Sequence, residues 1–286
     1  MSKNVSSGSG PDLILGQKPD NPQETLKEKF YYSGFFAAEM TCSVIKAANY
    51  NPVGHYYFAV DITVTNADKA LLQRVKEVVM NKRGIISPVK GAYNLSARGK
   101  DRVQIVLNFL NRYPIIIGDL AKNRIILLRQ ALAYLKEHRG SSEHQVKIEV
   151  MERIRKKLRT IKEIGIVDIS YTLKDTNQDT VGYFLSGVLD GEGSFGFKTS
   201  GSNKEPYFAI AMKDQKIVEL CRDFIGHGSV RKRKDGVYHY EINRSKIILN
   251  ACEIFLVRYP LKHRRQSERL QAVQRILNDH TLRSPR

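Results

Sequence analysis

The chain has 286 residues, 42% of them hydrophobic, and 47 Lys and Arg against 29 Asp and Glu give it a formal net charge of +18. This length allows one large or two medium domains. No apolar run approaches the roughly 18 residues that a membrane span needs, and the first twelve residues have no apolar signal core. The positive charge favours nucleic acid as partner, with an anionic membrane surface second.

The first half begins with a flexible tail and continues as a mixed helix and strand pattern. Helical spacing and strict alternation of apolar residues distinguish the two kinds of element. The predicted elements are a helix at 31–40, strands at 42–47 and 56–65, a helix at 68–81, two short strands between 84 and 98, and helices at 101–111 and 120–137.

A linker follows, because the Gly and Ser residues of 137–145 break the preceding helix. The next segment predicts an amphipathic helix with a strongly basic outer face. Its apolar positions are Val146, Val150, Ile154, Leu158 and Ile161. Two interpretations stay open: a solvated linker helix, or a helix that lies near phosphates.

The second half repeats the order of the first. Its predicted elements are a helix at 180–192, strands at 194–199 and 207–213, a helix at 214–225, strands at 228–233 and 237–242, and helices at 244–257 and 264–278. Each half thus reads α-β-β-α-β-β-α with an extra closing helix. Four antiparallel strands covered by helices on one face leave the other face open to a partner.

Three landmarks recur in the same order and show that the halves are copies. Arg-Tyr-Pro starts at Arg112 and Arg258 (258 − 112 = 146), Tyr57 matches Tyr207 (150), and Gly34 matches Gly187 (153). We predict an α+β protein of two pseudo-symmetric half-domains. The expected boundaries are a tail over 1–27, half-domains over 28–139 and 179–280, a linker over 140–178 and a tail over 281–286.

The three cysteines are widely separated and form no CxxC pair. Neither a disulfide framework nor a zinc site is expected. A reducing compartment fits, such as an organelle or the bacterial cytoplasm.

The stretch YFLSGVLDGEGSFGFKTS, from Tyr183, is an apolar helix with small residues and two acids at its end. Two such helices can pack with their backbones close. The small residues are Ser33, Gly34, Ala37 and Ala38 in one copy and Ser186, Gly187 and Gly191 in the other. A pseudo-twofold axis would then bring Glu39 and Glu192 together. Two close carboxylates repel, and they are hard oxygen ligands suited to Mg²⁺, which also binds phosphate oxygens. Asp190 is interpreted as shaping the helix end.

LSGVLDGEG (Leu185 to Gly193) resembles the signature of the LAGLIDADG homing endonucleases, and YSGFFAAEM (Tyr32 to Met40) resembles a degenerate first copy. The resemblance is to monomeric double-motif members and covers about 30 to 280. It implies sheets that form a saddle over double-stranded DNA, which is cut on both strands. It implies metal ligation by Glu39, Glu192 and the carbonyls of Ala38 and Gly191. Mg²⁺ or Mn²⁺ would support cleavage, and Ca²⁺ would occupy the site without supporting it.

The family also places a basic residue near each scissile phosphate, shortly after the proline of the third helix. By position, the candidates are Lys122 and Arg265, although an exposed charge on a surface helix would look the same.

Alternation along the strands predicts which side chains face DNA. The expected DNA-facing residues are Asp61, Thr63, Arg98, Lys100, Lys198, Arg231 and Arg233. An arginine can bond guanine bidentately, and an aspartate can accept from cytosine.

Two alternatives to a homing endonuclease remain open. One is an RNA maturase that binds its host intron, and the other is a DNA-binding protein of the same fold without cleavage activity. Two matched acids count against the second, because a pure binder gains nothing from negative charge beside phosphate.

Overall fold

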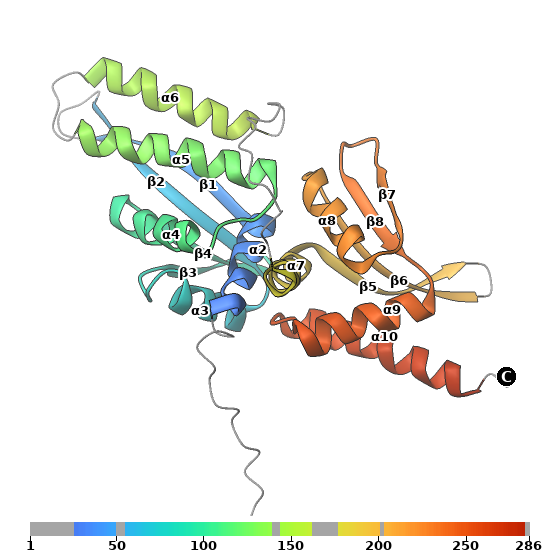
Figure 1. Ribbon diagram of the computed structural model, residues 1–286. Coiled ribbons are helices and arrows are strands. Elements are labelled where there is room, and N and C mark those ends of the chain that lie inside the picture. Colours follow the sequence, from blue (N-terminus) through green and yellow to red (C-terminus); the bar gives the residue numbers. More distant parts are fainter. Residues whose placement is uncertain (1–25, 50–54, 139–143, 162–176, 201–202, 284–286) are drawn as a thin grey trace, which may run out of the picture.

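A computed structural model of the protein describes residues 26–49, 55–138, 144–161, 177–200 and 203–283. It contains two four-stranded antiparallel sheets, with strand orders β1-β2-β4-β3 and β5-β6-β8-β7 (Figure 1). The two orders are the same when the strands of each half are counted from its own start. The predicted α+β fold with two pseudo-symmetric halves is therefore confirmed.

Each half runs through its elements in the predicted order. The first comprises α2 (Phe30–Glu39), β1 (Met40–Asn49), β2 (His55–Asn66), α3 (Lys69–Val78), β3 (Ile85–Val89), β4 (Ala92–Arg98), α4 (Lys100–Arg112) and α5 (Asp119–Glu137). The second comprises α7 (Gln178–Glu192), β5 (Gly193–Ser200), β6 (Asn203–Met212), α8 (Gln215–Ile225), β7 (Ser229–Lys232), β8 (Tyr238–Ile242), α9 (Ser245–Glu253), a π-helical turn (Ile254–Arg258) and α10 (Arg264–Arg283). The helix predicted at 244–257 thus changes to π geometry in its last turn.

The sheets follow the expected alternation. On β2, Val60, Ile62 and Val64 are fully buried against the helices, and the side chains between them belong to the opposite, open face. Directly paired residues share a face, so the pairs Thr63↔Ser96 and Asp61↔Arg98 extend the open face onto β4. The core of each half is therefore the layer between its sheet and its helices.

The linker helix α6 (His144–Thr160) covers part of the first half. It buries Met151, Ile154 and Leu158, and its Glu152 is paired with Lys46 of β1 at 3.0 Å. Lys46 alternates in phase with the buried β1 residues, so α6 lies on the helix-covered side of the sheet. Of the two interpretations of this helix, the structure supports packing on the side away from the open face.

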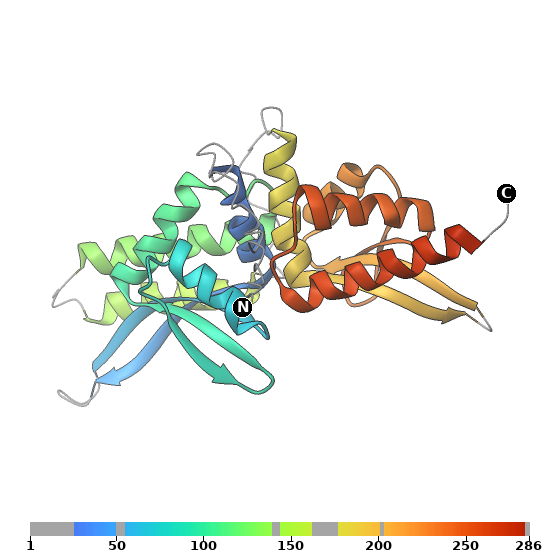
Figure 2. The ribbon, with the colours of Figure 1, turned by 90° about the horizontal axis from the view of Figure 1, so that it is seen from below.

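The two motif helices α2 and α7 stand side by side between the halves (Figures 1 and 2). A Cβ added at Gly34 would lie 1.8 Å from the carbonyl oxygen of Phe184, and one added at Gly187 would lie 1.9 Å from that of Tyr31. Only glycine fits at either position, so the two backbones touch at the crossing. This is the close approach that the small residues predicted.

The motif serines have a different role from the glycines. Ser33 Oγ donates to the carbonyl of Tyr113 at 2.5 Å, and Ser186 Oγ donates to that of Pro260 at 3.2 Å. Each hydroxyl therefore ties its motif helix to the Arg-Tyr-Pro segment of its own half. The hydrogen bonds add this role to the small size for which the sequence analysis singled out both serines.

Two aspartates join the halves reciprocally. Asp68, the N-cap of α3, accepts from the backbone N–H of Arg264 at 3.0 Å, at the start of α10. Asp214, at the start of α8, accepts from the N–H of Leu120 at 3.0 Å, at the start of α5. Each carboxylate thus satisfies a first-turn donor of the other half, where the helix dipole favours negative charge.

We predict that Gly187→Ala lowers the free energy of unfolding by about 3 kcal/mol, the upper end for overpacking, because the added methyl meets backbone atoms that cannot rotate away. Urea unfolding monitored by circular dichroism measures the change. Gly196→Ala is the control, since its Cβ would lie 3.3 Å or more from the Tyr207 ring and hydroxyl. Equal stability of the two variants would show that the helices are not held at this crossing.

Candidate metal and nucleic-acid site at the motif helix ends

Glu39 and Glu192 occupy the same position in the two halves. Each is the last residue of its motif helix, and the next residue, Met40 or Gly193, already starts the following strand. The two sites are linked across the interface, since a Cβ on Gly191 would lie 3.3 Å from Glu39 Oε1. The predicted meeting of the two acidic helix ends is therefore what the structure shows.

The environment of this pair is unfavourable for negative charge. Burial and the charge of Glu192 raise the pKa of Glu39 to about 7, against a single hydrogen bond from Asn66. Burial also raises the pKa of Glu192. The carboxyl end of a helix carries partial negative charge, and two such ends meet here. A cation between the glutamates would offset the repulsion between them, the partial charge of the helix ends and the cost of burying the carboxylates.

The donor set suits a hard divalent cation. Two carboxylates are present, and the carbonyls of Ala38 and Gly191 lie in the last helical turns, where the helix offers no N–H partner. Among the described residues no group of three or more His, Cys, Asp or Glu side chains could hold a metal. An ion here would therefore need the backbone, water or phosphate oxygens to complete its shell.

Two long-helix residues that the sequence analysis missed reach this place. Arg124 of α5 donates to the carbonyl of Met40 at 2.9 Å, and Gln266 of α10 donates to that of Gly193 at 2.7 Å. Both acceptors directly follow the motif acids. The buried pairs Leu128 and Leu270, Ala131 and Val273, and Leu135 and Leu277 all differ by 142 positions, as do Arg124 and Gln266 (266 − 124). The two side chains are thus structural counterparts.

The surroundings of the two acids differ in a second respect. Asn66 Nδ2 donates to Glu39 Oε1 at 3.3 Å. Asp68 and Asp214 are counterparts 146 positions apart, so Met212 takes the place of Asn66 in the second half. Glu39 therefore receives an amide hydrogen bond from a position where the second half has a methionine, which has no such donor.

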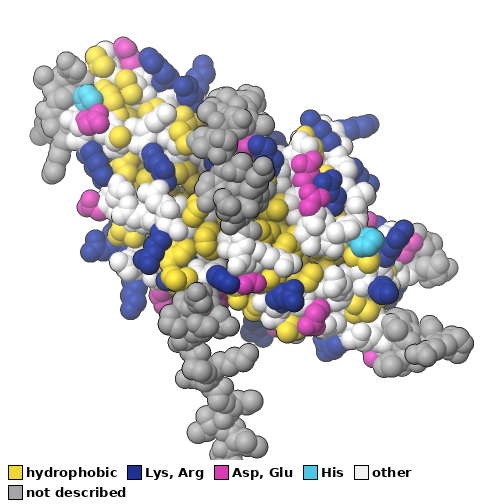
Figure 3. All heavy atoms as spheres, in the orientation of Figure 1, with side chains coloured by type: hydrophobic (Ala, Val, Ile, Leu, Met, Phe, Trp, Pro, Cys, Tyr) yellow, Lys and Arg dark blue, Asp and Glu magenta, His cyan; other side chains and the backbone are white. Residues whose placement is uncertain are grey.

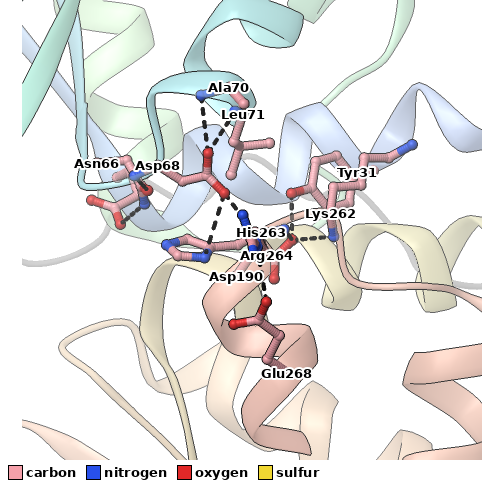
Figure 4. A network of polar contacts seen from close by, with 11 residues as sticks. Tyr31, Asn66, Asp68, Ala70, Leu71, Asp190, Lys262, His263, Arg264 and Glu268 are labelled. Carbon is pink, nitrogen blue, oxygen red and sulfur yellow. Dashed lines mark hydrogen bonds and ion pairs between the residues drawn. The ribbon is translucent and has the colours of Figure 1, made fainter. Parts of the chain in front are cut away.

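Asp190 lies at the centre of a buried network (Figure 4). Its Oδ2 accepts from the Tyr31 hydroxyl at 2.5 Å and from the backbone N–H groups of Lys262 and His263 at 2.6 and 2.8 Å. Burial raises its pKa to about 6 although these bonds favour the charged form. Asp190 thus joins both motif helices to the segment after Pro260, rather than only shaping the end of its own helix.

The pseudo-symmetric equivalent of this contact lacks both of its members. The counterparts 153 positions away from Asp190 and Tyr31 are Ala37 and Phe184. An alanine opposite a phenylalanine leaves neither a buried acid nor an unpaired hydroxyl. The degenerate first motif therefore reflects a paired replacement at the interface.

Lys122 and Arg265, the predicted basic residues, both lie near the start of a long helix. Lys122 Nζ donates to the carbonyl of Ile116 at 3.1 Å, and burial lowers its pKa. Arg265 is exposed in the first turn of α10. Their assignment near the scissile phosphates stays a prediction, whereas Arg124 and Gln266 form hydrogen bonds to the carbonyls that follow the motif acids.

The open face of the first sheet carries an ordered polar group. Asp61 accepts from Thr63 Oγ1 at 2.8 Å and from Ser96 Oγ at 2.6 Å, and Arg98 Nε lies 3.8 Å from its Oδ1. Both carboxylate oxygens of Asp61 thus order neighbouring side chains, and its contact with cytosine stays a prediction. Lys100 Nζ donates to the carbonyl of Leu135 at the end of α5, and its contact with DNA stays a prediction.

On the second sheet, Lys198 and Arg231 lie on the open face as predicted. Lys198 Nζ is 2.5 Å from Glu241 Oε1, and Arg231 pairs directly with His239 across the strands. Arg233 follows β7 and is paired with Asp235 at 3.0 Å. Figure 3 shows Lys and Arg side chains spread over both halves on the side that it presents. Lys198 and Arg231 give the open face of the second sheet cationic side chains, which suit a polyanion partner.

Comparisons with known proteins agree with this architecture. The profile of the LAGLIDADG endonuclease family matches residues 185–273. The structure of I-GzeII in complex with its DNA target superposes with a TM-score of 0.73 at 16% identity, covering 90% of this chain and 92% of that one. I-SmaMI, bound to uncleaved DNA target in the presence of calcium ions, gives 0.70 at 18% identity, covering 90% and 94%. I-LtrWI, bound to target DNA, gives 0.71 at 16% identity, covering 90% and 91%.

No curated protein sequence matches the chain. The resemblance to the LAGLIDADG homing endonuclease family is nevertheless confirmed: the profile matches the second half, and the fold of double-motif members extends over nine-tenths of the chain. Within the described residues, no helix is long and apolar enough to cross a bilayer.

We predict that stability falls as pH rises from about 4 to 7 in EDTA. The folded chain holds protons on Glu39 and Asp190 up to pKa values of about 7 and 6, against ordinary values of 4.5 and 3.8. It therefore binds more protons than the unfolded chain in this window, and stability declines with pH. Glu39→Gln should raise the melting temperature at pH 8. The free energy of unfolding should increase by at most about 3 kcal/mol.

Thermal unfolding at several pH values measures this effect, and the exposed Glu137→Gln serves as the control. Millimolar Mg²⁺ should stabilise the wild type at pH 8 more than it stabilises Glu39→Gln. A loss of stability for Glu39→Gln in EDTA would contradict repulsion at the pair.

Proposed function

We propose that this protein is a site-specific, divalent-metal-dependent DNA endonuclease that makes a double-strand break in a long target site. The observation that carries the proposal is the meeting of Glu39 and Glu192 at the ends of two helices that touch at Gly34 and Gly187. A structural role alone gives no reason to place two acids there, because without a cation the two carboxylates repel each other.

In this proposal, the open faces of the two sheets receive the duplex and the motif ends meet its backbone between them. Glu39, Glu192 and the carbonyls of Ala38 and Gly191 would hold Mg²⁺ or Mn²⁺. When bound, the ion supplies charge stabilisation at the phosphorus and a more acidic water. Arg124 and Gln266 fix the carbonyls just beyond the acids, which keeps each carboxylate in place at the end of its helix.

The polar side chains of the faces would contact the target. Thr63, Ser96 and Arg98, ordered by Asp61, serve the first half, and Lys198 and Arg231 serve the second. The whole chain supplies both half-sites, so a monomer suffices for an asymmetric target.

We predict that Glu192→Gln binds the target as tightly as the wild type but cuts it about 10³-fold more slowly, because a poorly held ion forfeits several kcal/mol of transition-state stabilisation. The target is first selected from a randomised duplex library in Ca²⁺. Binding is then measured in Ca²⁺ and cleavage of a supercoiled plasmid in Mg²⁺.

The exposed Glu253→Gln makes the same charge change away from the site and should behave as the wild type. Cleavage that survives in Glu192→Gln would remove this residue from the mechanism. Selection of structured RNA in place of any duplex would favour the maturase, and tight duplex binding without any cleavage would favour a binding protein.

We predict unequal cleavage of the two strands, because Arg124 brings a positive charge to one motif end and Gln266 brings none to the other. Nicked circles should accumulate before linear product in the wild type. Arg124→Gln should slow one strand by about 10- to 100-fold, in the range for loss of one preorganised donor, and Arg124→Lys should recover part of the rate. Strand-specific end labels identify the affected strand. Equal slowing of both strands would indicate a general structural effect.

A further inference from the structure

A cationic cavity opens where β4 leads into α4. Its volume is about 610 Å³, and its lining includes Lys82, Arg83, Arg98, Lys100 and Arg102 with Asp101 as the one acid. Lys82 and Arg83 are exposed in the turn before β3, and Arg98 keeps 61% of its side chain exposed. Clustered cations repel one another, so this cavity favours a bound anion.

The cavity is continuous with the open face of the first sheet. Arg98 is paired with Asp61 across β2 and β4, and Ile85, another lining residue, is paired with Ser96. Both pairs belong to the face that carries Thr63. The ion pair with Asp61, at 3.8 Å, holds Arg98 between the face and the cavity. An anion in the cavity would therefore lie at the margin of a polymer on the sheet.

The second half has a cavity at the same place with a different character. It measures about 260 Å³ and is lined in part by His227, Ser229, Glu241, Asn243 and Arg244. The correspondence follows from the strands, since Ile85 and Ser229 each begin the third strand of their sheet and each follows a glycine. One arginine faces one glutamate here, where the first half gathers five cations against one acid.

We propose that the cavity of the first half, the 82–102 cavity, binds a backbone phosphate of the DNA duplex. This phosphate would lie beside the strands whose side chains face the DNA groove. Lys82, Arg83 and Arg102 provide the contacts, and Arg98 bridges to the bases. This inference rests on the proposed function. The first half-domain then holds its half-site more tightly than the second, and after cleavage it releases its product more slowly.

The test uses the full-length chain and the selected target duplex in Ca²⁺. The variant Lys82→Asn/Arg83→Gln/Arg102→Gln removes three charges, and asparagine suits position 82 because its φ is +64°. Lys156→Gln/Lys157→Gln/Arg159→Gln removes three charges from α6, on the helix-covered side, and is the matched control. Arg244→Gln tests the cavity of the second half.

Loss of one phosphate contact should lower the slope of log K against log salt by about 0.9, so the affinity deficit shrinks about 3.5-fold between 50 and 200 mM salt. The α6 control and Arg244→Gln should keep a slope nearer that of the wild type. In phosphate ethylation interference, the cavity variant should lose one phosphate position that the wild type shows, on the flank held by the first half. That product end should also dissociate faster from the cavity variant.

Two failures are distinguishable. If the wild type binds no duplex, the proposed function and the phosphate site fall together. If the wild type binds, but the cavity variant matches the α6 control in slope and in ethylation pattern, the site is overturned and the endonuclease proposal stands. Interference that disappears on the flank of the second half would likewise overturn it.

Discussion

The structure depends on the backbone contact between α2 and α7. Gly34 and Gly187 leave no room for a side chain at the crossing, and this fixes the distance between the two halves. Because each helix runs without a loop into the first strand of its sheet, the same contact sets how the sheets lie relative to each other. The ends of the helices are then forced together, and whatever side chains stand there must share one environment.

In that environment the two acids destabilise the fold, although the proposed metal site needs them. Two carboxylates, partly removed from water at the negative ends of two helices, resist ionisation, and the pKa of Glu39 moves to about 7. The fold tolerates this repulsion because other carboxylates hold the interface: Asp68 and Asp214 accept first-turn N–H groups from the opposite half. These two bonds and the glycine contact keep the acids close whether or not a cation lies between them.

Much of this was readable from the sequence, and for identifiable reasons. Period-two and period-3.6 patterns placed nearly every element, and duplication supplied each pattern twice. The glycines in both motifs predicted the close crossing of the two helices, because no other residue permits it. Arg124 and Gln266 escaped notice because their role depends on the phase of two long helices, which only tertiary packing reveals. The hydrogen bonds of Asp61 and Lys100 were not predicted for a related reason: alternation gives a side chain's face, but not the neighbour with which it forms a hydrogen bond.

Duplication also shows which positions are free to diverge. The glycines and the cross-linking aspartates are kept in both halves, since a change at either member would separate the pair of helices. At the positions related by pseudo-symmetry, Ala37 corresponds to Asp190 and Phe184 corresponds to Tyr31. Because the acid and its hydroxyl partner are both absent there, no buried polar group is left unsatisfied. Arg124 and Gln266 each donate to a backbone carbonyl, which accepts equally well from a guanidinium or an amide. The side chain at this position is therefore not restricted by a matching side chain in the other half. The charge there can therefore differ between the halves without cost to the interface, and a pseudo-symmetric scaffold can carry two unequal sites, as the proposed cleavage of two unlike DNA strands requires.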